Sequence, residues 1–339
     1  PVDESTMPEG ASVMLFSCFT FWYLGNYYYN IFNKLSVVEA GGKDSGLMFL
    51  TATAQLVVGA LYALAVWLVG HNPITFSKQP VPKLTQQDVV GITVLAFWSA
   101  IAHAGSVFAL TAGSIAFGQI VKAAEPVFAA VLSTLIYKKP PSAAKAMTLP
   151  IIILGVCIAC LKPDANGDYK VEFDVTALIA GSIANIAASF RGSENARLMT
   201  DKGLKDRIDG VGNQFALAQV IGSLVLIPIA VALEGYSLPK FVSLVKSNGS
   251  FAYNLFMAGM TFYGYNELST MTIKYTSAVT MSVANTAKRV IVIVGVALAF
   301  GKPLTNEEIA GSVISISGVF IYSIADMLAA RFLPKAKSA

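Results

Sequence analysis

Four basic residues stand inside stretches of the sequence that are otherwise long and apolar. They are Lys122, Arg191, Lys288 and Arg289, and the last two are adjacent in SVANTAKRVIVIVGVALAF, residues 282–300. If these stretches cross a bilayer, each cation near the centre costs at least about 2.5–3.5 kcal/mol. Together the four require on the order of 10 kcal/mol, which is comparable to the net stability of a whole domain. Buried acids or a bound anion must therefore offset them.

Three acidic residues lie in the same apolar stretches and could pair with the cations. Glu125 lies three residues after Lys122, and Glu194 lies three residues after Arg191. At this spacing each acid can share a helix face with its cation. This leaves only Glu267 for Lys288 and Arg289. Such pairs could merely lock the helices together, and for the first pair this alternative stays open. Internal pairing cannot neutralise all four cations, because only three acids are present. The surplus positive charge favours an anionic ligand in a water-accessible cavity.

The basic side chains also limit the kind of anion. Lysine acts as a point charge towards phosphate, whereas arginine forms a two-pronged contact with phosphate or carboxylate. Adjacent residues of a helix diverge by about 100°. Lys288 and Arg289 can therefore converge only on a group beside the face that they share, or approach it from two sides. A phosphate fits this description, and a large apolar drug does not.

Other polar and aromatic residues are candidates for the cavity wall. A lone histidine in a helix often only packs, but His103 is flanked by Ala and Gly, which leave space, and Ser106 lies one turn away. In FYGYNE, Tyr263 and Tyr265 point to opposite helix faces, and we expect Tyr265 to offer its hydroxyl to the cavity while Tyr263 packs. The tyrosines of FWYLGNYYYNIFNK, residues 21–34, form either an aromatic belt or a cavity wall, and the belt is favoured.

The composition indicates a membrane protein. Of the 339 residues 55% are hydrophobic and 13% charged, the mean hydropathy is +0.62, and soluble domains carry about 25% charged residues. The net charge of +4 is too small for a nucleic-acid-binding face. Cys157 and Cys160 have CxxC spacing, but no second Cys pair or nearby His completes a metal set. With two histidines and no acidic cluster, we expect no catalytic residues, no metal site, no cofactor and no enzyme.

Ten stretches approach the length of about 20 residues that a membrane-spanning helix needs. We expect these spans at residues 11–35, 46–70, 86–110, 113–137, 146–162, 174–198, 210–233, 252–273, 277–300 and 307–331. The prediction is therefore an all-α fold of ten transmembrane helices, with both termini on one side. The loops on that side carry about twice as many Lys and Arg, so the positive-inside rule places both termini inside. Pro126 is expected to bend the fourth span.

The second half of the sequence repeats the first. SIAFGQIVKAAEPVFAAVLSTLIYKKP, from Ser114, aligns without gaps with SAVTMSVANTAKRVIVIVGVALAFGKP, from Ser277. The fourth and fifth spans thus repeat as the ninth and tenth, and the halves are residues 1–170 and 171–339. Because each half has five spans, the second must insert upside down, as in many secondary transporters. A duplicated scaffold that transports nothing is the alternative.

The charges are not repeated together with the scaffold. In the same alignment Lys288 and Arg289 lie over Glu125 and Pro126, whereas Lys122 lies over Asn285. The cations of the two segments are therefore offset by about one helical turn. This offset is what an asymmetric ligand with a single phosphate to hold would require.

Four stretches carry a resemblance to a known family: NYYYNIFNK, IVKAAEPVF, FYGYNELST and NTAKRVIVIVGVALAFGKPL. In this order and spacing they resemble the plastid phosphate translocators of the drug/metabolite transporter superfamily, most of all the triose-phosphate/phosphate translocators. The resemblance covers essentially the whole chain. It implies a ten-helix inverted-repeat fold in the plastid inner envelope membrane. It also implies strict exchange of inorganic phosphate for triose phosphate or 3-phosphoglycerate by alternating access.

The resemblance assigns roles to seven residues of this sequence. The residues that hold the phosphate in the family fall on Lys122, Lys288 and Arg289. Those near the carbon end of the substrate fall on His103, Arg191 and Tyr265. Ser106 stands where threonine is expected in the family, and it keeps a hydroxyl at that position.

The resemblance leaves other functions open. Sister translocators carry phosphoenolpyruvate, hexose phosphate or pentose phosphate with the same Lys-Arg pair. A nucleotide-sugar transporter of the superfamily would need a larger cavity and a platform on which the base stacks. In a channel or scaffold with internally paired charges, Lys288→Ala should leave anion binding unchanged. The expected partners are inorganic phosphate, three-carbon phosphate esters and the lipid bilayer, with no nucleic acid; no oligomeric state follows from the sequence.

Overall fold

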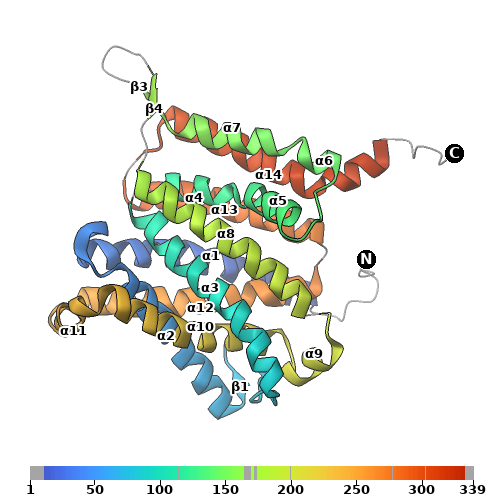
Figure 1. The fold of residues 1–339 in the computed structure, drawn as a ribbon. Coiled ribbons are helices and arrows are strands. Elements are labelled where there is room, and N and C mark those ends of the chain that lie inside the picture. The colour runs from blue at the N-terminus through green and yellow to red at the C-terminus, as the bar shows by residue number, and fades with distance from the viewer. Residues whose placement is uncertain are drawn as a thin grey trace.

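The computed structural model describes residues 11–112, 115–163, 169–171, 174–198, 200–276, 278–301 and 303–332. Ser114 and Ser277, where the aligned segments begin, lie outside this part. Helices make up nearly all of the described chain (Figure 1). The long helices are α1 (Ala11–Glu39), α2 (Met48–Val69), α3 (Gln86–Ala112), α8 (Val175–Leu198), α10 (Val211–Glu234), α12 (Gly249–Tyr275), α13 (Ala278–Ala299) and α14 (Asn306–Phe332). The shorter ones are α4 (Ile115–Ala123), α5 (Glu125–Leu135), α6 (Ala143–Ala146), α7 (Leu149–Ala159), α9 (Lys202–Ile208) and α11 (Leu238–Ser247).

Five stretches of the described chain are long and apolar enough to cross a membrane. They are Met48–Val69, Gln86–Leu110, Val175–Leu198, Gly212–Ser247 and Asn306–Arg331. The long helices α1 and α12 are not among them, because amide, hydroxyl and charged side chains interrupt their apolar sequences. The chain is thus a helical polytopic membrane protein, in which the more polar helices contribute the polar groups of the interior.

The predicted fourth span is not one helix but two. The α-helical pattern stops after Ala123 and resumes at Glu125, and Pro126 lies in the first turn of α5. Proline has no N–H to donate and its ring clashes with the carbonyl four residues earlier, so it kinks or breaks a helix. The carbonyl of Val121, next to the break, accepts hydrogen bonds from Ala124 N at 3.1 Å and from Asn185 Nδ2 of α8 at 2.8 Å. The expected bend is therefore a break of one residue, Ala124, whose backbone angles of φ −74° and ψ 0° stay near those of a helix.

The described chain is helical as predicted, apart from two short hairpins that join the helices. Strands β1 (His71–Asn72) and β2 (Ser77–Lys78) pair antiparallel between α2 and α3. Strands β3 (Leu161–Pro163) and β4 (Tyr169–Val171) pair in the same way between α7 and α8. These hairpins lie in polar connections of the sequence, where a span-based prediction assigns no secondary structure.

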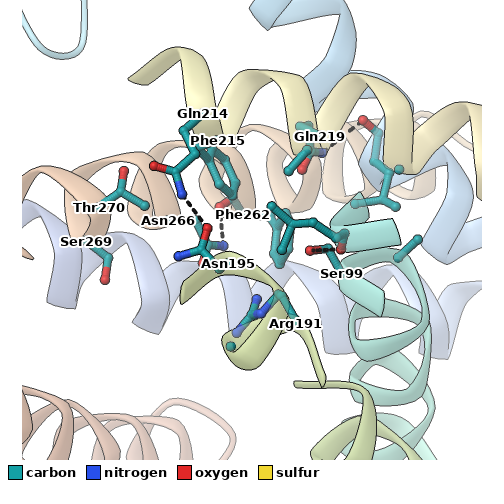
Figure 2. A pocket seen from close by; sticks show the side chains of 16 residues that line it. Ser99, Arg191, Asn195, Gln214, Phe215, Gln219, Phe262, Asn266, Ser269 and Thr270 are labelled. Atoms are coloured by element: carbon teal, nitrogen blue, oxygen red, sulfur yellow. Dashed lines mark hydrogen bonds between the residues drawn. The ribbon is translucent and has the colours of Figure 1, made fainter. Parts of the chain in front are cut away.

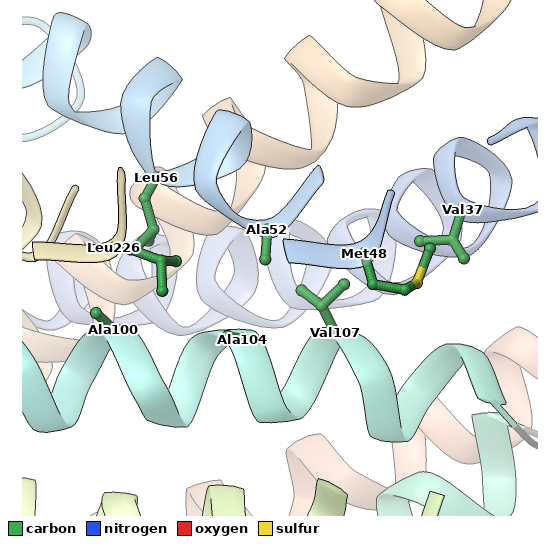
Figure 3. Close-up of a cluster of buried hydrophobic side chains, with 8 residues drawn as sticks. All are labelled: Val37, Met48, Ala52, Leu56, Ala100, Ala104, Val107 and Leu226. Carbon is green, nitrogen blue, oxygen red and sulfur yellow. The ribbon is translucent and has the colours of Figure 1, made fainter. Parts of the chain in front are cut away.

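Four helix pairs make the most extensive contacts: α1 with α12, α3 with α8, α7 with α14, and α2 with α10. The pair α7 and α14 packs backbone against backbone, since a Cβ added to Gly155 would lie 2.4 Å from Ser315 N. A buried apolar cluster joins α1, α2, α3 and α10 on one side of the bundle (Figure 3). Its small members, such as Ala52, Ala100 and Ala104, let these helices approach closely.

The outer surface and the chain direction agree with a bilayer. Large apolar side chains such as Phe16, Leu68 and Leu298 are 73%, 89% and 77% exposed, which in water would be unfavourable. The chain enters α1 and leaves α14 on the same side of the bundle (Figure 1). This agrees with an even number of crossings, while the assignment of that side as the inside stays a prediction.

Candidate functional site

The candidate site is a cavity of about 150 Å³ where α1, α3, α8, α12 and α13 meet the break between α4 and α5. All seven residues that the sequence singled out line it: His103, Ser106, Lys122, Arg191, Tyr265, Lys288 and Arg289. They come from five helices and from positions as far apart as 103 and 289. The structure therefore brings the predicted residues together, while their binding of a ligand stays a prediction.

The cations approach the cavity from two directions. Lys122 ends α4, and Lys288 and Arg289 lie in the middle of α13. Nη2 of Arg289 lies 3.7 Å from Oε2 of Glu125, and Nζ of Lys288 lies 5.0 Å from the ring centroid of Trp22. Although consecutive residues of a helix diverge, both side chains of this pair reach the cavity, so a group between α4 and α13 can contact all three cations.

The acids pair differently from the sequence-based expectation. Glu194 binds Arg197, with an Oε2–Nη2 distance of 2.7 Å, rather than Arg191. Arg191 and Arg197 both lie three residues from Glu194, and its carboxylate pairs with Arg197. Glu267 is fully buried away from the cavity lining and accepts a hydrogen bond from Asn72 Nδ2 at 2.6 Å.

Glu125 also departs from its expected partner. The break after Ala123 interrupts the helix face that Lys122 and Glu125 were expected to share, and the ion pair of Glu125 is with Arg289 of α13. Among the described residues that line the cavity, Glu125 is the only acid. The cationic surplus is therefore larger than the sequence suggested, with four cations facing one carboxylate.

Aromatic rings form one wall of the cavity. The ring of His103 lies 4.2 Å from that of Phe262 and 6.4 Å from that of Tyr29, measured between centroids. Neither ring nitrogen of His103 has a hydrogen-bond partner within the described chain, although the residue is only 3% exposed. Tyr265 lines the cavity beside Tyr29, with the ring centroids 5.6 Å apart. The ring of His103 also lies close to the backbone of Ala52 of α2, so contact of His103 with a ligand stays a prediction.

Two tyrosines test the expectations for the aromatic stretches. Tyr263 is fully buried against Tyr62 and Phe215, on the side of α12 away from the cavity. Tyr29 is 3% exposed and lines the cavity, so the preference for an aromatic belt was wrong at this position. Tyr28, its neighbour, is 46% exposed, because successive helical residues face different directions.

The comparisons with known proteins agree with this geometry. The sequence profile of the Triose-phosphate Transporter family matches residues 13–323. The chain belongs to this family. It is a family of transporters rather than of enzymes.

Several chloroplast transporters are similar to this member of the family. It is 28% identical to the xylulose 5-phosphate/phosphate translocator of Arabidopsis thaliana, over 94% of this chain and 72% of that one. It is 28% identical to phosphoenolpyruvate/phosphate translocator 2 of the same plant, over 94% and 78%. It is 29% identical to the triose phosphate/phosphate translocator of Spinacia oleracea, over 91% and 71%. The identities are nearly equal, so they do not select a substrate.

A solved structure shares the fold of this transporter. It is titled "Crystal structure of protein", has a TM-score of 0.51 and 13% identity, and the match covers 97% of this chain and all of the other. At this identity the likeness concerns the fold alone. It shows that the whole helical bundle, rather than a part of it, has a counterpart among solved proteins.

Amide side chains that sequence reasoning missed also line the cavity of this transporter. They are Asn26, Asn30, Gln119, Asn185 and Asn266. Gln119 Nε2 donates to Asn30 Oδ1 at 2.8 Å, and Asn30 Nδ2 donates to Asn26 O at 2.7 Å, which ties α4 to α1. The signal in the sequence is the spacing of four residues between Asn26 and Asn30 in an apolar stretch, which places both amides on one helix face.

A second cavity of about 270 Å³, here called the vestibule, adjoins the first (Figure 2). The two share the lining residues Ser99, Arg191, Phe262 and Asn266. Amides and hydroxyls line most of its polar wall, and Gln214 Nε2 donates to Asn195 Oδ1 across it. The vestibule lies where α8 and α12 end and α3 and α10 begin, so Arg191 stands between it and the inner cations.

Within the described residues, no group of three or more His, Cys, Asp or Glu side chains lies close enough to hold a metal ion. Ser106 Oγ donates to Ala102 O at 2.6 Å, which leaves its oxygen to accept from a ligand. The arrangement thus offers cationic and neutral hydrogen-bond donors around a small space. Such a set binds a compact oxyanion with a polar remainder.

Proposed function

We propose that this protein is an antiporter that exchanges inorganic phosphate for triose phosphate or 3-phosphoglycerate by alternating access. The observation that carries this proposal is the surplus of charge in one cavity, where Lys122, Arg191, Lys288 and Arg289 face Glu125. An empty cavity of this kind is unfavourable in a membrane, and a doubly charged phosphate offsets it. The relatives in Arabidopsis and spinach are named as phosphate translocators, which supports the same class of substrate.

We assign the two ends of the substrate to two groups of residues. Lys122, Lys288 and Arg289 hold the phosphate, because they approach it from α4 and from α13. The remaining polar end faces the other four residues, His103, Ser106, Arg191 and Tyr265. In this arrangement the guanidinium of Arg191 binds the carboxylate of 3-phosphoglycerate, and neutral donors serve the carbonyl and hydroxyl of triose phosphate.

Helix contacts support the proposed inverted repeat of residues 1–170 and 171–339. If α1 corresponds to α8 and α3 to α12, the contact of α1 with α12 corresponds to that of α8 with α3, and both are observed. Two hydrogen bonds show the same correspondence between the halves. Asn185 of α8 donates to Val121 O, and Tyr23 of α1 donates to Ala284 O at 3.0 Å, and these two carbonyls coincide in the sequence alignment.

Ten crossings complete this arrangement, with the pairs α4–α5 and α6–α7 each counted as one span. In this conformation the vestibule gives access from the side where α1 begins and α14 ends. Rocking of the two halves about the cavity then exposes the substrate to the opposite side. The substrate stays between the halves throughout the cycle.

Strict exchange follows from the energy of the intermediate state. With no ligand bound, several cations would pass through a closed and dry state in which nothing offsets their desolvation. A bound dianion supplies the counter-charge and draws the halves together, so only the loaded carrier changes conformation. Because the similar relatives are named as chloroplastic, we place the protein in the inner envelope membrane of plastids.

One alternative substrate is favoured by a specific observation. The vestibule adds space with amide and hydroxyl groups in its lining next to Arg191, at the polar end of the substrate. A pentose phosphate, as named for the Arabidopsis relative, has additional hydroxyls that would extend into it. A sister function in pentose phosphate exchange therefore ranks second. A competition panel in proteoliposomes separates the two.

The panel measures uptake of labelled phosphate into phosphate-loaded proteoliposomes against triose phosphate, 3-phosphoglycerate, phosphoenolpyruvate, xylulose 5-phosphate, glucose 6-phosphate and UDP-glucose. We expect the three-carbon triose phosphate and 3-phosphoglycerate to compete best. Stronger competition by xylulose 5-phosphate would establish the sister function. No competition by any phosphate ester would refute the proposal.

A further inference from the structure

Glu125 has an unusual place among the acidic residues of the interior. It lines the cavity, its Oε2 lies 3.7 Å from Nη2 of Arg289, and 38% of its side chain remains exposed. The other two interior acids, Glu194 and Glu267, are held by different partners outside the cavity. Glu125 is therefore the acid within the described lining that can answer the positive charge of the site.

The ion pair of Glu125 is loose. At 3.7 Å the two atoms lie beyond hydrogen-bonding distance. The pair of Arg207 with Asp88, between α9 and α3, shows the contrast: two hydrogen bonds of 2.7 and 2.6 Å fix it. A charge pair without a hydrogen bond yields readily to a partner that offers one, and phosphate offers arginine two. Arg289 can thus exchange Glu125 for a bound phosphate.

The position of Glu125 in the chain ties its carboxylate to the broken helix. Glu125 lies in the first turn of α5, where the partial positive charge of a helix N-terminus favours an anion. It lies directly after the break at Ala124, whereas Arg289 belongs to the continuous helix α13. A change in the angle between α4 and α5 therefore changes the distance between Glu125 and Arg289.

We propose that Glu125 is the internal counter-ion of the cavity, which holds Arg289 while the site is empty and yields it to the phosphate of the substrate. By doing so it sets the charge of the anion that the cavity accepts. The inference rests on the proposed phosphate exchange.

Removal of this carboxylate makes the cavity one unit more positive, so phosphate binds more tightly and leaves more slowly. The increase in affinity is larger for trivalent anions than for divalent ones.

The test combines binding and transport of inorganic phosphate for Glu125→Gln. Titration calorimetry of the full chain in detergent is expected to show a Kd about tenfold lower than that of the parent protein, since an opposing charge near the ligand is gone. In proteoliposomes the maximal exchange rate is expected to fall about tenfold, because release becomes limiting. The affinity ratio of 3-phosphoglycerate to phosphate, measured at alkaline pH, should rise.

Two further variants complete the design. Glu194→Gln makes the same chemical change on α8 outside the cavity, and both constants should stay within about twofold of the parent. Glu125→Asp keeps the charge but withdraws it by one methylene, so its constants should lie between those of the parent and of Glu125→Gln. The Asp variant also carries the test if the Gln variant does not fold.

The outcomes separate this inference from the proposed function. Unchanged or weaker phosphate binding by Glu125→Gln, or by Glu125→Asp in its place, overturns the role of the internal counter-ion. A merely structural role would lower affinity and rate together rather than move them apart. If the parent protein itself neither binds nor exchanges phosphate, the proposed function fails instead.

Discussion

The paired helices α4 and α5 and the single helix α13 align in sequence, yet they differ in shape and charge. The first breaks at Ala124, while the second runs unbroken for 22 residues through the equivalent position. Lys288 and Arg289 of α13 stand where the broken segment has Glu125 and Pro126. The two segments thus present opposite charges at equivalent positions on the two sides of one cavity.

This difference shows how a duplicated scaffold can hold an asymmetric ligand. What the segments share lies in their backbone, since the aligned carbonyls of Val121 and Ala284 each accept a side chain from another helix. What they do not share are the groups that face the cavity. In the proposed mechanism the shared part supports symmetric motion, and the unshared part supplies a phosphate-binding end and a polar end in one site.

The largest effect is expected at the pair of cations in the middle of α13. Lys288→Gln removes a cation from the phosphate site, and losing one partner of a buried charge pair costs about 2–5 kcal/mol. The Kd for inorganic phosphate in calorimetry should therefore rise at least about 30-fold.

The matched control is Lys240→Gln, on α11 outside the cavity. Lys240 Nζ donates to Ser45 O at 3.2 Å, and its removal should leave the Kd within about twofold. Equal losses in both variants would show that the cavity does not bind phosphate through its own cations.

A smaller effect is expected at the break. Pro126→Ala restores an N–H and removes the steric clash, so α4 and α5 gain the option to join as α13 does. We expect the maximal exchange rate to fall about fivefold, with the KM for phosphate changed less than about twofold, because a bend rather than a ligand contact is altered. Transport kinetics in proteoliposomes measure both.

Pro150→Ala is the control for this comparison. Pro150 lies in the first turn of α7, on the exposed surface, and not in the cavity lining. Its substitution should leave both constants within about twofold. If Pro126→Ala behaves in the same way, the break is not part of the transport cycle.

The smallest effect is expected at a loop contact on the side opposite the vestibule. Lys43 Nζ lies 2.5 Å from Asp174 Oδ2. Burial, the largest single effect, would raise the pKa of the Asp174 carboxyl. The hydrogen bond and charge of Lys43, together with backbone hydrogen bonds from Ala177 and Thr176, outweigh it and hold that pKa below its ordinary value of 3.8. The same bond raises the pKa of the Lys43 ammonium above its ordinary value of 10.5.

The pH window of this contact follows from the two directions. Because the pKa of Asp174 is lowered in the folded protein, the carboxylate stabilises the fold at pH values above its unfolded pKa. This stabilisation is lost as the pH falls through the folded pKa. Because the pKa of Lys43 is raised in the folded protein, the ammonium group stabilises the fold at pH values below its unfolded pKa. This stabilisation is lost as the pH rises through the folded pKa. Lys43→Gln should lower the unfolding midpoint by at most about 1 °C at neutral pH and by nothing at either extreme.

The control for this contact is Lys83→Gln, which removes an exposed lysine from the connection before α3. It should leave the midpoint unchanged across the same pH range. If the effect of Lys43→Gln does not vary with pH, the ion pair does not stabilise the fold.

Much of the site could be predicted from the sequence, because charge in an apolar stretch is a strong local signal. Lys122, Lys288 and Arg289 were found in this way, and the helical period separates Tyr265 from Tyr263. These conclusions need only the residue type and its position on one helix. The repeat likewise needs only an alignment of the chain with itself.

The remaining details depend on contacts between distant segments. Glu194 has an arginine three residues away on each side, and local spacing does not show that it binds Arg197. Glu267 is held by Asn72, which lies 195 positions earlier in a hairpin that no span-based pattern reveals. Tyr29 turns inward because α1 packs on α12, and its two tyrosine neighbours have the same sequence signal.

The central claim is that the bound anion offsets the cations while the carrier changes conformation. It is tested most directly by efflux of labelled phosphate from proteoliposomes, with and without phosphate in the external medium. We predict efflux at least about tenfold faster with external phosphate, because an empty cavity cannot close over its cations. Equal rates into a medium that lacks any exchangeable anion would contradict the account.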